Sequence, residues 1–149
     1  MIEPTIELEI SRIISASRER VFNAWKKIDA MQHWWAASEN NAFAGGSIDF
    51  RVGGKYHLSM RVFNKDIVRT SYGEYVEIDE PSRLVFTWNW QHDETPMNSL
   101  VTLQFNSLEL NKTELILRHE KLPDTEMGRK HQEGWNAVLL KLQDYLLKQ

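Results

Sequence analysis

The chain has 149 residues, no cysteine, and a net charge of −3 at pH 7 with acidic and basic residues interspersed. Such a length predicts a single domain over residues 1–149, and the charge pattern argues against a nucleic-acid partner. Without cysteine, disulfides, thiolate metal sites and a cysteine nucleophile are excluded. The N-terminus has no basic segment followed by an apolar one, and no long apolar run occurs elsewhere, so we expect a cytoplasmic protein without membrane insertion.

The first part of the chain predicts a strand and two short helices. Apolar and charged residues alternate over 6–10, as in a strand with one buried face. The segment 15–28 begins with serines that can cap a helix and continues with apolar residues at helical spacing. A second helical turn is predicted over 29–35, capped by its first residue, Asp29. The small and polar segment 38–46 predicts a loop.

From Ser47 onward the apolar residues recur with a period of two, which indicates a run of antiparallel strands. Gly53 and Gly54 predict a tight hairpin turn, because glycine accepts the positive φ angles that such turns require. The predicted strands of this run lie at 48–52, 56–62, 72–78, 84–90, 101–105 and 113–119.

The last segment, 124–149, has the strongest periodicity in the chain. Apolar residues recur at steps of three and four for about six turns, which predicts one long amphipathic helix capped by Asp124. Two residues on or beside the apolar stripe are unusual for simple packing. Gly134 costs roughly 1 kcal/mol relative to alanine in a helix, and His131 adds a polar ring to an apolar face.

Together these elements predict an α+β fold. Seven strands and one long helix can bury each other's apolar faces if the sheet curves around the helix. The expected architecture is therefore a helix-grip fold, with a curved seven-stranded antiparallel sheet around the C-terminal helix. Two short helices lie between its first and second strands.

Six short motifs carry a family resemblance, and they occur over residues 20–25, 33–35, 51–56, 73–78, 81–88 and 131–135. In order and spacing they resemble the family named for the C-terminal domain of the activator of Hsp90 ATPase. That family belongs to the START-like, or Bet v 1-like, superfamily (SRPBCC). The resemblance implies the same helix-grip fold with an elongated, mostly apolar cavity between sheet and helix. In related proteins such cavities take lipids, steroids, polyketides or plant hormones.

The leading functional hypothesis is binding of a small apolar or amphipathic ligand in this cavity. The candidate ligand-binding residues are Trp34, Phe50, Tyr56, Tyr72, Trp88, Phe105, His119, Met127, His131, Gly134 and Trp135. Each also has a structural alternative, since aromatic rings commonly fill a core and buried histidines are commonly hydrogen-bonded. Gly134 could either allow close helix packing or leave room for a ligand.

Two other functions stay open. The family name suggests a cofactor of an Hsp90-type chaperone. The activators, however, carry a separate N-terminal domain, and this sequence starts directly at the grip domain. An enzyme of the cyclase or aromatase type is the other alternative. No paired carboxylates or nucleophile motif points to catalytic residues, and the histidines are too scattered to predict a metal site. We expect no cofactor, and the oligomeric state stays open.

Overall fold

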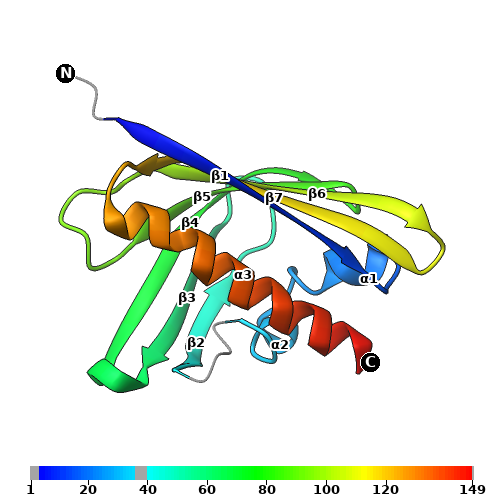
Figure 1. Cartoon of the computed structure of the whole chain (residues 1–149), viewed down its shortest axis with the longest axis horizontal. Helices are drawn as coiled ribbons and strands as arrows, with labels where there is room; N and C mark the ends of the chain where they lie inside the picture. The colour runs from blue at the N-terminus through cyan, green and yellow to red at the C-terminus, as the bar shows by residue number, and fades with distance from the viewer. Residues whose placement is uncertain (1–3, 36–39, 149) are drawn as a thin grey trace.

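In the computed structural model, a seven-stranded antiparallel sheet curves around the long helix α3 (Figure 1). The structure describes residues 4–35 and 40–148. The strands are β1 (Thr5–Ile14), β2 (Asn41–Ile48), β3 (Lys55–Val62), β4 (Ile67–Asp79), β5 (Arg83–Trp90), β6 (Ser99–Glu109) and β7 (Lys112–Pro123). The helices are α1 (Arg18–Asn23) and α2 (Ile28–Met31), both between β1 and β2, and α3 (Glu126–Leu147). The predicted helix-grip fold is confirmed.

The strand order β1-β7-β6-β5-β4-β3-β2 places β1 and β2 at the two edges of the sheet. From β2 to β7, each strand pairs with the next strand in the chain, and β1 joins the sheet by pairing with β7. Leu103 and Leu117 from the sheet and Leu139 and Leu142 from α3 are completely buried. The main core therefore lies between the sheet and the helix that the sequence periodicity had predicted to fill it. Within the described ranges, no helix is both long and apolar enough to cross a membrane.

The second strand lies earlier in the chain than predicted. β2 occupies Asn41–Ile48, so most of the predicted loop is a strand, and Phe50 and Val52 follow the strand instead of forming it. Ser38 and Glu39 of the predicted loop lie outside the described residues. The prediction failed because the segment lacks apolar alternation. Its pairing with β3 is irregular, with a register shift between Phe43 and Gly46.

The connection from β2 to β3 is longer than the predicted two-residue hairpin. It runs from Asp49 to Gly54, and Gly53 has the positive φ of 83° that made glycine the expected residue there. The backbone N–H of Gly53 donates to the carbonyl oxygen of Tyr75, and that of Tyr75 donates to Gly54, both at 2.9 Å. The connection is thus fixed to β4, which a local turn prediction could not foresee.

The long helix is capped one residue later than predicted. The side chain of Thr125 accepts a hydrogen bond of 3.0 Å from the backbone N–H of Gly128, while Asp124 pairs with Arg129 at 2.9 Å. At the first helix, Ser17 is the cap, which confirms one of the two serines, Ser15 and Ser17, that begin the predicted segment. The predicted cap of α2 is wrong, because the residue before its first turn is Lys27, which makes no side-chain capping bond.

Two glycines of α3 predict opposite effects for the same substitution. A Cβ atom on Gly128 would overlap the carbonyl oxygen of Pro123, whereas one on Gly134 would meet no atom within 4 Å. Gly128→Ala should therefore destabilise the protein by about 1–3 kcal/mol. Gly134→Ala should stabilise it by about 0.5–1 kcal/mol, since alanine favours helix. Urea unfolding followed by tryptophan fluorescence measures both, and equal signs would contradict this assignment.

Candidate functional site

A pocket of about 290 Å³ lies between α3 and the neighbouring strands of the sheet. From α3 it is lined by Met127, Lys130, His131, Gly134, Trp135, Ala137 and Val138. The sheet contributes Leu58, Met60, Arg69, Ser71, Trp88 and Trp90. Trp35, Asn41 and His92 complete the lining. These helix residues recur three and four positions apart, as 127, 130, 134 and 137 or 127, 131, 135 and 138 do, so one helix face forms one wall of the pocket.

Gly134 opens this wall. It lies on the pocket, is exposed, and has no atom within 4 Å of the position where a side chain would begin. Gly134 therefore does not serve close packing of the helix against the sheet. It borders open space. Gly128, near the start of the same helix, is the glycine that packs closely, against the backbone of Pro123.

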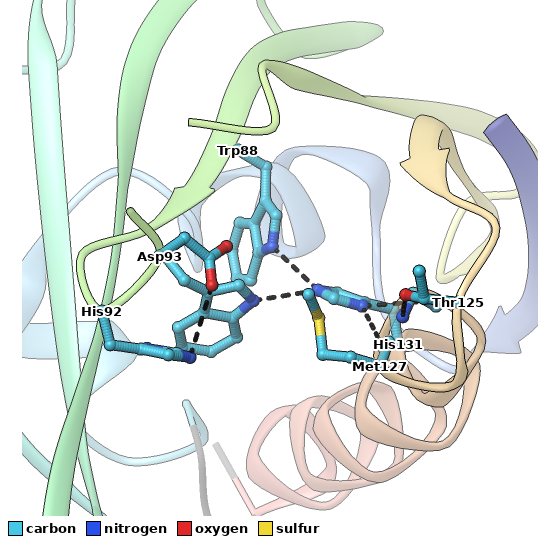
Figure 2. A network of polar contacts seen from close by, with 8 residues as sticks. Trp88, His92, Asp93, Thr125, Met127 and His131 are labelled. Atoms are coloured by element: carbon cyan, nitrogen blue, oxygen red, sulfur yellow. Dashed lines mark hydrogen bonds and ion pairs between the residues drawn. The ribbon is translucent and has the colours of Figure 1, made fainter. Parts of the chain in front are cut away.

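His131 lies at the centre of a polar network beside the pocket. Its Nε2 accepts hydrogen bonds from the indole N–H groups of Trp88 at 3.2 Å and Trp90 at 3.0 Å. Its Nδ1 lies 3.0 Å from the carbonyl oxygen of Met127 and 3.2 Å from that of Gly128. Because carbonyl oxygens only accept, Nδ1 carries the proton and the ring is neutral. Figure 2 shows the contacts of His131 with Trp88 and Met127.

His119 extends the network into the core. Its Nδ1 accepts a hydrogen bond of 3.0 Å from the indole N–H of Trp135. Its Nε2 donates to the hydroxyl of Ser99 at 2.9 Å, because that hydroxyl itself donates to the carbonyl oxygen of Trp88 at 2.7 Å. The rings of His119 and His131 are 5.3 Å apart and nearly perpendicular. We refer to Trp88, Trp90, Trp135, His119 and His131 as the tryptophan–histidine network.

Both histidines of the network favour the neutral form. Burial lowers the pKa of His119 to about 2, with a further contribution from neighbouring His131. Burial also lowers the pKa of His131, although the carbonyl groups of Met127 and Gly128 act in the opposite direction. Since both nitrogens of each ring are occupied, neither ring is available to accept a proton from a bound molecule. The network holds the indole rings of Trp88, Trp90 and Trp135 in place by hydrogen bonds to the two histidines.

Of the predicted ligand-binding residues, five line the pocket, namely Trp88, Met127, His131, Gly134 and Trp135. Tyr56 lines a second, smaller cavity of about 20 Å³, and its hydroxyl donates to the carbonyl oxygen of Thr87 at 2.6 Å. Trp35, Leu58 and Trp88 contact both cavities and therefore separate them.

The other five predicted residues do not line the main pocket. Trp34 is completely buried in a corner, where its indole N–H donates to Ala24 at 3.2 Å. Phe50 and Phe105 pack against Phe22 in the core, with ring centroids 6.1 and 5.0 Å from it. His119 lies behind Trp135 in the network.

Tyr72 was predicted on the wrong face of its strand. Ser71, Gly73 and Tyr75 are the buried residues of this part of β4, so Tyr72 points to the opposite side. The register of β4 against β5 shifts between Tyr75 and Glu77, so the inward-facing residues change from odd to even numbers within the strand. The phase of Ile78 therefore does not hold for Tyr72.

Several lining residues were missed for identifiable reasons. Trp90 lies two residues after Trp88 on the same face of β5, so the strand period could have included it. Trp35 lines the pocket, whereas Trp34 was predicted to do so. The sequence of one short helical turn does not show which of two neighbouring residues faces the pocket. Arg69 and Lys130 are charged, so a search for apolar periodicity does not select them.

Comparison with known proteins supports the same fold. The profile of the "Activator of Hsp90 ATPase homolog 1-like protein" family matches residues 15–147. A search of curated proteins found no significant match.

Solved structures of similar fold cover nearly the whole chain. A protein from Rhizobium leguminosarum has 22% identity and a TM-score of 0.84, covering 98% of this chain and 97% of its own. An AHSA1-like protein from Aeromonas hydrophila has 23% identity and a TM-score of 0.80, covering 96% and 93%. An HSP90 activator from Plasmodium falciparum has 24% identity and a TM-score of 0.75, covering 94% and 95%. At these identities the likenesses show the fold. With the family profile matching most of its length, the chain belongs to the activator of Hsp90 ATPase homolog 1-like family.

Proposed function

We propose that this protein binds a small apolar or amphipathic molecule in the pocket between α3 and the sheet. The observation that carries the proposal is the open space beside Gly134, at a helix position where alanine would otherwise be favoured. A helix that served only to close the core would gain stability from a side chain there. The glycine leaves a space beside the helix that a large side chain at this position would fill.

The physical character of the lining supports the same proposal. Most lining side chains are aromatic or aliphatic, and the volume of about 290 Å³ is at the small end of ordinary ligand sites, which run from about 300 to 1,000 Å³. The indole rings of Trp88 and Trp90 are held nearly perpendicular by their shared bonds to His131. A preorganised apolar wall binds without the cost of ordering its side chains.

A neutral fluorescent probe tests the proposal. N-phenyl-1-naphthylamine should bind the wild-type protein with enhanced emission, and Gly134→Phe should reduce its affinity at least about tenfold by filling the pocket. Gly134→Ala is the matched control, because it removes the same glycine but adds only one methyl group. It should bind the probe within about threefold of wild type.

The comparison also separates binding from folding. Gly134→Phe faces open space, so its thermal unfolding should stay close to that of the wild type. Saturable binding that is unchanged in a folded Gly134→Phe variant would place the probe elsewhere and contradict the proposal. So would a wild-type protein that does not bind the probe.

A chaperone-cofactor role is the second candidate, favoured by the family match and by the similarity to the Plasmodium falciparum activator. Such a role would require an effect on the ATPase rate of the Hsp90 of the same organism. An increased rate on addition of this protein would support it, and an unchanged rate at saturating concentrations would remove it.

A further inference from the structure

The polar groups of the pocket are divided between two regions. The indole N–H groups of Trp88, Trp90 and Trp135 all donate to the two histidines of the network. These rings therefore have no N–H left for a ligand, and this region favours an apolar body. Any strong polar contact with a ligand must come from the remaining lining residues.

The charged lining residues are both cationic. They are Arg69 from β4 and Lys130 from α3, and no aspartate or glutamate occurs among the described residues that line the pocket. Arg69 is half-buried, and across residues 4–35 and 40–148 no hydrogen bond or ion pair engages its guanidinium. Within the described part of the chain, the one ion pair of Lys130 is with Glu126 at 3.5 Å, and the side chain of Glu126 is 83% exposed. Both cations are thus open to a ligand.

The field of Arg69 reaches the pocket. Burial and then the charge of Arg69 lower the pKa of His92, another lining residue, against the opposing effect of Asp93. Asp93 lies 3.8 Å from His92 and outside the lining (Figure 2). The ring of His92 is 5.7 Å from that of Trp90. The charge of Arg69 therefore acts close to the apolar wall of the pocket.

We propose that the natural ligand is an amphipathic anion whose carboxylate-type head group binds at Arg69 and Lys130 while its apolar body lies against the tryptophan–histidine network. The inference rests on the proposed function and specifies the class of ligand. A guanidinium suits this role because its planar donors match a carboxylate and it stays charged when partly buried. Arg69 is half-buried and has no partner among the described residues, so its charge is free to pair with such a head group.

Two pairs of probes isolate the head group. Anilinonaphthalene sulfonate and N-phenyl-1-naphthylamine share one aromatic body and differ by a sulfonate. Decanoate and 1-decanol share one alkyl chain and differ in charge, and each can compete with the neutral dye. In each pair the anion should bind wild-type protein about tenfold or more tightly than its neutral partner at low salt.

Substitutions then locate the preference. Arg69→Met and Lys130→Met should each weaken anion binding by about three- to tenfold and leave binding of the neutral dye within about twofold. Arg69→Lys should keep part of the preference. The matched controls Arg61→Met and Arg129→Met remove the same charge from β3 and α3 but outside the lining, so they should leave both affinities unchanged.

The outcomes distinguish the two proposals. If the neutral dye binds but decanoate competes no better than decanol, the anion inference is overturned and the pocket proposal stands. If the anion preference survives in both Arg69→Met and Lys130→Met, the inference is equally overturned. If no probe binds the wild-type protein, both proposals fall. An anion preference lost in these variants and kept in both controls supports the inference.

Discussion

His119→Leu should lower the free energy of unfolding by about 2–4 kcal/mol, although leucine fills a similar space. His119 is completely buried and joins Trp135 to Ser99. Leucine removes both hydrogen bonds and leaves the indole N–H of Trp135 buried without its acceptor. A buried donor left without its acceptor costs about 1–3 kcal/mol, and the lost contact with Ser99 adds to this.

The control for this change is His57→Leu. His57 lies in β3 and is exposed, so the same substitution there should alter stability by no more than about 0.5 kcal/mol. Chemical unfolding of the two variants beside the wild type gives the comparison. Equal stability of His119→Leu and wild type would show that the hydrogen bonds of the network contribute nothing to the fold.

The wild-type protein should lose about 2 kcal/mol of stability between pH 7 and pH 5 through His119 alone. The pKa of this histidine is about 2 in the folded protein and about 6.5 in an unfolded chain. Below pH 6.5 the unfolded state therefore binds a proton that the folded state does not. Stability must fall as the pH falls, by up to about 1.4 kcal/mol per pH unit, until the pH approaches the folded value.

His131 adds to this loss in the same direction, because burial lowers its pKa too. A proton on its Nε2 would also face the indole N–H groups of Trp88 and Trp90 instead of accepting from them. Urea unfolding at a series of pH values from 7.5 to about 5 measures the slope. In His119→Leu the slope should be visibly smaller, and an unchanged slope would assign the acid sensitivity to other groups.

The sequence predicted the elements whose patterns are long. The apolar stripe of α3 and the alternation in β3 and β5 recur over many residues, so they locate the sheet and the helix that fills it. Mutual burial of the strands and the helix predicted the curved sheet, and the family resemblance implied the same helix-grip fold. The predicted cap of α3 was one residue early, since Asp124 and Thr125 are both suitable capping residues and only the backbone conformation distinguishes them.

The site was predicted only in part, for physical reasons. A period of two assigns a face only where the strand has no bulge. The register shift between Tyr75 and Glu77 changes the phase of β4, so Tyr72 was predicted on the same face as Ile78 but lies on the other. The pairing of indole donors with His119 and His131 joins β5, β7 and α3, which no local pattern can show. The charged residues Arg69 and Lys130 become part of the pocket only through the tertiary fold.

Nuclear magnetic resonance of the protein with N-phenyl-1-naphthylamine would show whether the pocket under α3 is a binding site. We expect intermolecular contacts from the dye to the Met127 methyl group and the Gly134 backbone, both in the pocket lining. The Trp88 and Trp90 indole N–H signals should shift, and that of Trp34 should not. Dye contacts confined to residues outside the lining, with these indole signals unmoved, would rule out binding in this pocket.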